Sequence, residues 1–456
     1  MLYQKVKDFT IAAISLLKNR FTEGKTVPVT SRYKFRICSG KLVREKRFTY
    51  PLFKAFIESH QDELVELPEF RNCIKCCKES EILQKHLSHL GDMKDYQKED
   101  IESYFKNEYL FLLLSKLLHS VGGIKFDDSE FDKLYCQIES YLDSRFMRLF
   151  ALVPLCNFEL LGKELFFEED AKIAAVDSSE LDTLIDFKII NAERTSLSIP
   201  PYALKIHFTA EKDTQVDRQI PFERIQKVIC TLRIFKKGVF WYDNIYCFPL
   251  TWEPTRPFSR LLFMLPSQHS YGPKYVLEEE EKNNLMQIWK NFNDINRENR
   301  FVKIAIEKFD QAALRQRTED RLVDYITALE ALFLGTDEKG ELEYRLALRL
   351  ATSIGNSAQE RVRIRHVLKN AYKQRSSIVH GKKLKPIQIE GKKYSLEDLA
   401  THLEDSTRKS LQKFLLIAAQ KINHEKLLND IDEYMLRFCE RSFFKETTQE
   451  ETYEMR

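Results

Sequence analysis

The sequence predicts an α+β multidomain protein with a helical N-terminal part, a β-rich middle part and an all-α helical bundle at its C-terminus. The length of 456 residues exceeds what one compact domain usually holds. Apolar residues recur at helical spacing before residue 145 and after residue 290. Between them, short β-branched or aromatic segments alternate with turn residues, and nine of the thirteen prolines lie from Pro154 to Pro273.

We therefore expect four segments. They are a helical region at 1–145, a β-rich or α+β domain that senses or selects a substrate at 146–290, the bundle at 291–425, and a C-terminal helix with a polar tail at 426–456. The segments expected to be helical are 9–17, 109–119 and 131–150, and those expected to be strands are 203–209, 228–235 and 239–248. The acidic run 278–281 indicates either a boundary or the solvated start of a helix.

The composition is that of an ordinary soluble protein, with 43% hydrophobic and 31% charged residues. A net charge of +3 excludes a polycation, so any surface for nucleic acid must come from local clustering of charge. The nine scattered cysteines are typical of a reduced, cytoplasmic chain. The apolar run 109–118 is too short to span a bilayer, and no membrane partner is expected.

One group of thiols and imidazoles has the residue types of a zinc site. Its members are Cys73, Cys76, Cys77, His86 and His89. The whole stretch reads as a single helix, and ligands on one straight helix do not enclose a metal. Buried cysteines and a solvated histidine pair are the favoured interpretation, and the acidic clusters at 127–128 and 168–170 are typical of solvated turns. We expect neither a metal nor another cofactor.

The bundle is expected to contain helices at 298–315, 319–334, 341–354 and 358–375, and a long helix after Ser395. Thr318 is the expected N-cap of the second helix, Gly335 and Gly355 end the second and third, and Asp398 completes a capping box. A loop is expected at 381–393. The apolar stripes of the second and last helices are Leu322, Ile326, Leu329 and Phe333, and Leu399, Leu403, Leu411, Phe414 and Ala418.

Basic residues are concentrated at 361–385, where nine lysines and arginines occur without an acidic residue. Such a surface suits phosphate oxygens, although a solvated helix face would have the same composition. The residues expected to contact RNA are Arg361, Arg365, Lys369, Lys373, Lys382 and Lys383. Arg375 continues the apolar stripe of Ile364, Leu368 and Ala371, so it should face inward or into a cleft, where its charge needs a partner.

Arg375 and His380 form an R-x4-H pattern followed by Gly381. The bare pattern is weak, because a second match at 361–366 lies wholly within a predicted helix. There, five positions separate the two side chains by about 140° around the axis. The match at Arg375 instead ends near a helix end, where a departure from helical geometry would allow its two side chains to converge.

Three stretches occur in one order and resemble one family. They are LVDYITALEALFLG at 322–335, RLALRLA at 345–351 and YKQRSSIVHG at 372–381. Together they resemble the Apea-like branch of the HEPN superfamily, over about residues 297–425. The first 290 residues show no comparable likeness.

The resemblance implies a metal-independent RNA endonuclease that acts as a homodimer, with the R-x4-H residues of two protomers in one composite cleft. His380 would act as general base or acid at the ribose 2′-OH and the leaving 5′-oxygen. Arg375 would stabilise the charge that develops on the phosphate. Because the nucleophile is the 2′-OH of the RNA, DNA should resist cleavage.

Four further residues would support this pair. Glu330 would orient His380, hold Arg375, or be a surface carboxylate. Arg349 and Tyr372 would contact RNA or pack structurally. Ser376 would donate to a phosphate or act as a cap.

Proteins of this branch are associated with anti-phage defence by abortive infection. The resemblance therefore implies a toxin-like effector that cleaves host RNA such as tRNA, with a phage-derived or other trigger bound by the N-terminal region. The alternative is a non-catalytic HEPN module that dimerises and binds RNA or a protein.

Overall fold

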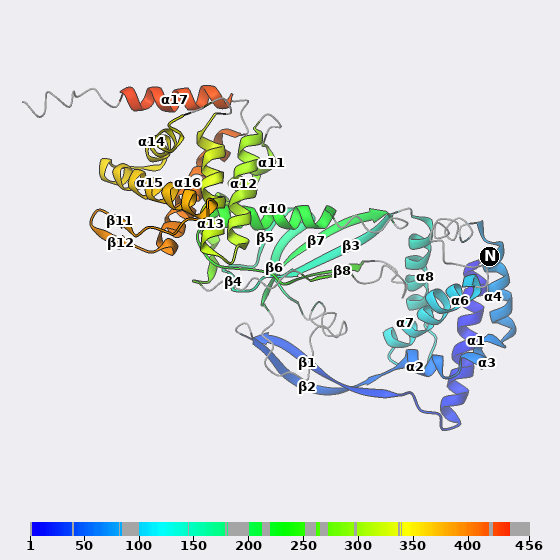
Figure 1. The fold of residues 1–456 in the computed structure, drawn as a ribbon. Helices are drawn as coiled ribbons and strands as arrows, with labels where there is room; N and C mark the ends of the chain where they lie inside the picture. Colours follow the sequence, from blue (N-terminus) through cyan, green and yellow to red (C-terminus); the bar gives the residue numbers. More distant parts are fainter. Residues whose placement is uncertain are drawn as a thin grey trace, which may run out of the picture. The chain divides into compact units, whose positions relative to one another are not determined.

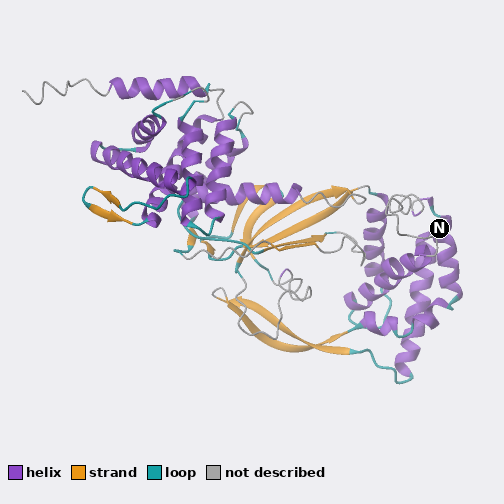
Figure 2. Cartoon of the chain, viewed as in Figure 1, coloured by secondary structure: helices purple, strands orange, loops and turns teal. Residues whose placement is uncertain are grey.

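The computed structural model describes residues 2–38, 41–81, 83, 100–144, 146–177, 180, 200–211, 219–250, 261–264, 272–295, 299–335, 338, 340–418 and 423–437. The fold is mixed α+β: helices predominate towards both ends of the sequence, and the middle of the sequence forms a six-stranded sheet (Figures 1 and 2). The chain forms two compact units, 1–223 with 240–267 and 224–239 with 268–456. This division differs from the four predicted segments, because the N-terminal helices and the sheet share a unit and 224–239 joins the C-terminal helices.

The first unit begins with helices. They are α1 (Leu2–Thr22), α2 (Phe53–Glu58), α3 (Gln61–Val65), α4 (Pro68–Glu79), α6 (Asp100–Phe105), the π-helix η1 (Lys106–Phe111), α7 (Leu112–Ser120) and α8 (Asp128–Asp143). The predicted helices at 9–17 and 109–119 are confirmed. The predicted helix at 131–150 is wrong after Asp143, where the chain leaves α8 and enters a strand. Asp127 caps α8 by accepting a hydrogen bond of 2.9 Å from the N–H of Glu130.

A β-hairpin interrupts the region predicted to be helical. Its strands are β1 (Val29–Cys38) and β2 (Lys41–Pro51), which pair antiparallel. The sequence carries a signal for it, because Tyr33, Phe35 and Ile37 alternate with basic residues at a period of two. The hairpin corrects the prediction of an all-helical segment at 1–145.

The central sheet has the strand order β5-β6-β7-β3-β8-β9, and each of its pairings is antiparallel. Its strands are β3 (Phe146–Pro154), β5 (Glu164–Glu168), β6 (Ala171–Ala175), β7 (Tyr202–Glu211), β8 (Asn244–Pro249) and β9 (Leu261–Met264). A short strand β4 (Phe158–Leu160) follows β3. The strand predicted at 203–209 is confirmed, whereas that predicted at 239–248 is a strand only from Asn244. The acidic cluster 168–170 lies where β5 turns into β6.

The predicted strand at 228–235 is wrong, because it lies in helix α10 (Gln219–Phe235). Ile225, Val228, Ile229 and Leu232 are buried at positions i, i+3, i+4 and i+7, the spacing of a helix face. Short β-branched runs fit both periods, and here tertiary packing selected the helix. The last carbonyls of α10 are satisfied by side chains of α16 (Leu396–Ala418), since Gln412 Nε2 donates to the oxygens of Ile234 and Phe235 at 2.8 and 2.7 Å.

The second unit continues with β10 (Tyr275–Leu277), the 3-10 turn η2 (Glu279–Glu281), α11 (Lys282–Asn293), α12 (Arg300–Leu314), α13 (Thr318–Phe333), α14 (Leu342–Ile354), α15 (Ala358–Val379), β11 (Ile387–Ile389), β12 (Lys392–Tyr394), α16 and α17 (His424–Arg437). The acidic run 278–281 begins a helix and marks no boundary between units, because Glu278 and Glu281 form a capping box. The short hairpin β11–β12 occupies the stretch predicted to be a loop.

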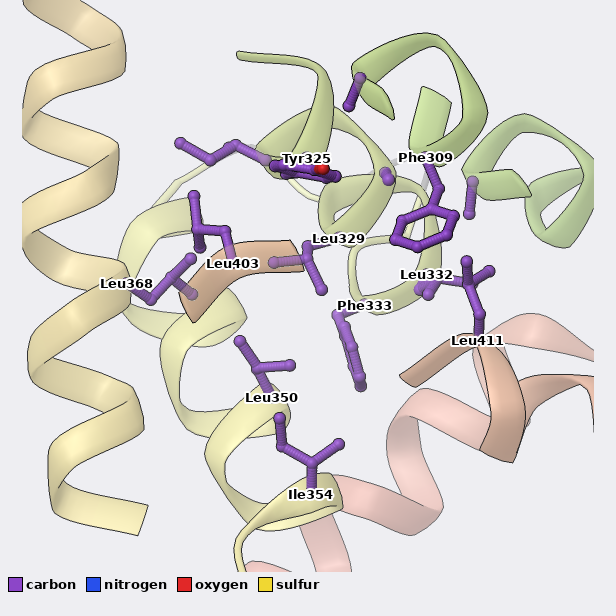
Figure 3. Packing of buried hydrophobic residues seen from close by; sticks show 14 of the residues in the cluster. Phe309, Tyr325, Leu329, Leu332, Phe333, Leu350, Ile354, Leu368, Leu403 and Leu411 are labelled. Atoms are coloured by element: carbon purple, nitrogen blue, oxygen red, sulfur yellow. The ribbon is translucent and has the colours of Figure 1, made fainter. Parts of the chain in front are cut away.

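The core of this unit is built around α13 (Figure 3). Its predicted stripe is confirmed, and Leu322, Ile326, Leu329 and Phe333 are fully buried. The predicted apolar residues of α16 are buried as well. Ser395 and Asp398 form the predicted capping box, with bonds of 2.8 Å and 3.1 Å between each backbone N–H and the other side chain. Thr318 is not a cap; it is the first residue of α13, and its hydroxyl donates to Glu397.

The described residues contain no helix with the length and apolarity to cross a bilayer. They also contain no group of three or more metal-binding side chains. Cys73 and Cys77 lie on α4 as buried thiols. His86, His89 and the polar tail 438–456 lie outside the described residues.

Candidate functional site

Helix α15 carries Arg375 and ends at His380, and it is one turn longer than predicted. Ser357 caps its start by accepting a hydrogen bond of 3.1 Å from the N–H of Glu360. Leu368 and Ala371 are fully buried against the core, and Arg375 lies on the same face with 27% of its side chain exposed. The helix was predicted to end at about residue 375, and it runs to Val379.

Arg375 is held by a carboxylate of α13. Its Nη1 donates a hydrogen bond of 2.8 Å to Oε1 of Glu330, and the hydroxyl of Tyr372 donates to the same oxygen at 2.9 Å. The guanidinium carbon lies 5.4 Å from the centre of the Tyr372 ring, within range of a cation–π contact. Of the alternatives for Glu330, the structure therefore shows the one in which it holds Arg375.

The guanidinium of Arg375 keeps most of its hydrogen-bonding capacity. It has five N–H groups, of which one reaches Glu330. Its Nε is buried and meets no acceptor in the described part of the chain. A buried donor without an acceptor is costly. An anion that approached the exposed part of this side chain would find donors available.

Tyr372 is half-buried beside this pair. Burial, and next its hydrogen bond to Glu330, raise the pKa of Tyr372. The hydroxyl therefore stays protonated at neutral pH and donates to the carboxylate. Its packing against Arg375 and Glu330 matches the structural role that the sequence left open.

His380 ends α15 and is exposed. The helix closes in a Schellman motif, in which the N–H of Lys382 donates to the oxygen of Ser377 at 2.7 Å and that of Gly381 to the oxygen of Ile378 at 3.1 Å. Gly381 has a φ of 61°, the left-handed conformation that the motif requires. The backbone around His380 is therefore fixed.

This geometry corrects the expectation that Arg375 and His380 converge within one chain. The departure from helical geometry comes at Gly381, after the histidine, and not between the two residues. Five helical positions leave their side chains about 140° apart around the axis. Arg375 faces the core, and His380 faces outward.

His380 instead shares an exposed face with other residues of α15. Lys369, Lys373, Ser376 and His380 are spaced i, i+4, i+7 and i+11, which places them on one face, and all four are exposed. Ser376 is thus available as a donor at the surface, and its side chain does not cap the helix.

The loop after Gly381 adds Lys382 and Lys383, which are both exposed. Gln374 fixes this loop: it is 3% exposed, and its Nε2 donates to the oxygen of Lys385 at 2.8 Å. Gln374 was not among the predicted site residues, although a polar residue between the expected inward positions 371 and 375 was a signal. Nearer the start of α15, Arg361 Nε donates to the oxygen of Gly355 at 3.1 Å. Arg365 lies 5.8 Å from the ring centre of Tyr344.

Arg349 is placed elsewhere. It is 2% exposed, and its Nη2 donates to Glu338 and to Asp432 of α17, both at 2.7 Å. The hydrogen bond with Asp432 is the main cause that raises the pKa of Arg349. Of the two predicted roles, contact with RNA is contradicted by this burial. Arg349 joins α14 to α17.

Comparisons with known proteins add no assignment. No protein-family model matches the chain, and neither a curated protein nor a solved structure does.

Proposed function

We propose that the C-terminal helical unit is a metal-independent HEPN-type RNA endonuclease, in which Arg375 binds the scissile phosphate and His380 moves the proton. The observation that supports this most is the state of Arg375. Its guanidinium is anchored by Glu330, keeps unused donors, and lies on the helix that ends at the exposed His380. The exposed lysines on the same helix and loop would attract the RNA backbone.

The chemistry balances without an added reactant. The ribose 2′-oxygen attacks the adjacent phosphorus while a neutral imidazole takes its proton. The bond from phosphorus to the 5′-oxygen breaks, and that oxygen receives a proton from an imidazolium. The products are a 2′,3′-cyclic phosphate and a 5′-hydroxyl. Arg375 would stabilise the negative charge on the non-bridging oxygens through its planar donors.

The divergence of the two side chains in one chain is the reason to propose a homodimer. With Arg375 and His380 about 140° apart on a regular helix, one copy does not direct both at the same phosphate. A second copy of α15 across a two-fold axis would bring His380 of one protomer towards Arg375 of the other. The dimer would also supply two imidazoles, one as base and one as acid.

The same divergence supports a second candidate, a non-catalytic HEPN module that dimerises and binds RNA or a protein. In that case Arg375 is only a structural ion pair, and His380 is a surface residue. The toxin-like role in anti-phage defence, with host RNA such as tRNA as substrate and a trigger bound by the N-terminal region, belongs to the catalytic candidate.

The deciding experiment is RNA cleavage in the presence of EDTA by the wild type, Arg375→Ala and His380→Ala. We expect the wild type to leave 2′,3′-cyclic phosphate ends. Each variant should lose at least about 100-fold in rate, as is usual when a general acid–base group (His380) or a group that stabilises transition-state charge (Arg375) is removed. His366→Ala, on the same helix, is the matched control and should keep the wild-type rate. Equal cleavage by all four proteins would contradict the catalytic assignment, and RNA binding without cleavage would favour the second candidate.

A further inference from the structure

The hairpin β11–β12 extends the basic surface of α15. From residue 361 to residue 393 the chain has eleven basic residues and one acidic residue, although its net charge is only +3. Five of the basic residues are exposed lysines in the loop before the hairpin and on its second strand. They are Lys382, Lys383, Lys385, Lys392 and Lys393. No carboxylate in the described part of the chain forms an ion pair with any of them.

The turn of this hairpin is fixed by its local sequence. Ile389 pairs with Lys392, so two residues connect the strands. These residues are Glu390 and Gly391, with φ of 49° and 76°. Positive φ at both positions is what a two-residue turn of type I′ needs, and the twist of that turn matches the twist of the strands it joins. The lysines of β12 therefore extend from a short, regular ribbon.

Contacts with the helical bundle hold this ribbon beside α15 (Figure 1). Ile387 and Ile389 belong to the core of the unit and are 7% and 2% exposed. The hydroxyl of Tyr394 accepts a hydrogen bond of 3.2 Å from Nη2 of Arg363. The loop before the hairpin is bound by Gln374, as described above. The backbone of the hairpin is therefore held against α15.

The positions of Arg363 and Gln374 show on which side of α15 the hairpin lies. Each residue turns a regular α-helix by about 100°. With His380 at zero, Arg363 and Gln374 lie about 100–120° to one side, and Arg375 lies about 140° to the other. The exposed face of α15 that carries His380 is therefore flanked by the hairpin on the side away from Arg375.

This surface offers positive charges and no exposed Phe, Tyr or Trp. Tyr372 is the one such residue of α15 and Tyr394 the one of the hairpin, and both are half-buried. Tyr344 of α14 is exposed beside Arg365, on the opposite side of His380 from the hairpin. Proteins that bind single strands stack bases on aromatic side chains, whereas duplex RNA is recognised by shape through its phosphates and 2′-hydroxyls. Lysines on a rigid ribbon suit the duplex.

We propose that the hairpin β11–β12 and the loop before it bind the phosphate backbone of a double-stranded segment of RNA beside the cleavage site. The inference rests on the proposed endonuclease and names its substrate class, an RNA with a stem next to the cut. Unpaired ammonium groups are complementary to the closely spaced phosphates of a duplex. They would contact phosphates without reading bases, so the stem would be bound by its shape and not by its sequence.

The test compares two double variants of the full chain that remove the same charge from different elements of one unit. Binding of a fluorescent RNA duplex is measured by anisotropy over a range of salt, in a His380→Ala background so that the RNA is not cut. We expect Lys392→Gln/Lys393→Gln to lower affinity at least about 10-fold at low salt and to reduce the salt slope by about 1.8, since each phosphate contact of a duplex contributes about 0.9. Lys303→Gln/Lys426→Gln removes exposed lysines of α12 and α17 and should change affinity less than about 2-fold.

A further variant should raise affinity, which misfolding would not do. Glu390 is exposed at the turn and is the one carboxylate between residues 361 and 393. Glu390→Asn removes this charge, and asparagine tolerates the positive φ. We expect affinity for the duplex to rise about 2-fold, as for one exposed charge pair. An affinity that does not rise would contradict contact at the hairpin.

The other ligands define what would overturn the proposal. A single strand of the same RNA should bind at least about 5-fold more weakly than the duplex, because it presents phosphates at lower density. Equal or tighter binding of the single strand, equal loss in both double variants, or no loss in either would overturn the proposal. So would binding of anionic phospholipid vesicles as tight as that of the duplex.

The outcomes separate this inference from the endonuclease itself. Duplex binding that depends on Lys392 and Lys393, by a protein whose wild type cuts no RNA, would support the hairpin and leave the endonuclease proposal to fail alone. Cleavage by the wild type, with duplex binding unchanged in Lys392→Gln/Lys393→Gln, would support the endonuclease and overturn the role of the hairpin.

Discussion

Glu330 on α13 and Arg375 on α15 are 45 residues apart in the sequence and joined by a hydrogen-bonded ion pair of 2.8 Å. The side chains are 20% and 27% exposed, so the pair is largely shielded from water. Glu330 binds the guanidinium of Arg375 on the side that faces α13, and part of the guanidinium remains exposed to solvent. The orientation of Arg375, which we propose binds the phosphate, thus depends on Glu330 of a different helix.

Removal of the charge at Glu330 should therefore destabilise the C-terminal unit. We expect Glu330→Gln to lower the free energy of unfolding by about 1–2 kcal/mol, because Arg375 would keep a partly buried charge without its counterion. Glu319→Gln, on the same helix and only 3.8 Å from exposed Arg317, should cost less than about 0.5 kcal/mol. Urea unfolding measures the free energy of unfolding of both variants. Similar losses in the two would show that the ion pair between Glu330 and Arg375 stabilises the protein no more than an exposed pair.

The end of α15 should be sensitive at Gly381. Its φ of 61° suits glycine, and a Cβ there would meet no atom within 4 Å, so the cost of a side chain is conformational and not steric. We expect Gly381→Ala to lower stability by about 1 kcal/mol and to reduce the proposed activity by displacing His380. Gly381→Asn should lose less, since asparagine tolerates this conformation better. Thermal midpoints of the two variants check this expectation. Equal midpoints for Gly381→Ala and Gly381→Asn would contradict a helix end that requires the left-handed conformation at residue 381.

Arg349 should matter more for stability than any other arginine of α14. It is almost fully buried and bound to Glu338 and Asp432, so Arg349→Met leaves Asp432 without its partner and Glu338 with only the exposed Arg345. We expect a loss of about 3–5 kcal/mol. The control is Arg345→Met, because Arg345 binds the same Glu338 but is 48% exposed, and should cost about 0.5 kcal/mol. Limited proteolysis should release α17 in the first variant and not in the second.

The attachment of α17 should weaken as pH falls. Nε2 of His424 donates to the oxygen of Leu332 at 2.9 Å, and its ring stacks on Phe301 at 3.8 Å. Burial lowers the pKa of His424 below the ordinary histidine value of 6.5. The unfolded chain therefore binds the proton more readily than the folded one. The contribution of neutral His424 to the free energy of unfolding is fully present above pH 6.5. It is lost as the pH falls from 6.5 through the lower pKa of His424 in the folded state.

A second loss should follow in more acidic solution. Although desolvation opposes it, hydrogen bonds from Arg349 and from the N–H of Gly335 lower the pKa of Glu338. The contribution of ionised Glu338 to the free energy of unfolding is present above pH 4.5. It is lost as the pH falls from 4.5 through the lower pKa of Glu338 in the folded state. Thermal midpoints from about pH 8 to about pH 3 should show both steps in the wild type. Burial also lowers the pKa of His207 and His402, so these residues contribute to the first step. His424→Gln keeps a donor but does not titrate, so its first step should be smaller and its second unchanged; a first step of full size would exclude His424 as a contributor.

Much of the local structure of the C-terminal unit could be predicted from the amino-acid sequence. The stripe of α13, the stop at Gly355 and the capping box of Ser395 and Asp398 were all predicted, because helical period and capping depend on residues within one or two turns of each other. The inward direction of Arg375 followed from the same period.

The residues that those elements contact could not be predicted from the sequence and are known from the folded structure. Packing made a helix of 228–235, and the burial of Arg349 against α17 depended on a carboxylate 83 residues away. It also decided that Glu330 holds Arg375 and leaves His380 outside, which no local pattern specifies. These outcomes depend on contacts between distant segments, whose free energies are gained only when the chain has folded, and local period and propensity carry no information about them.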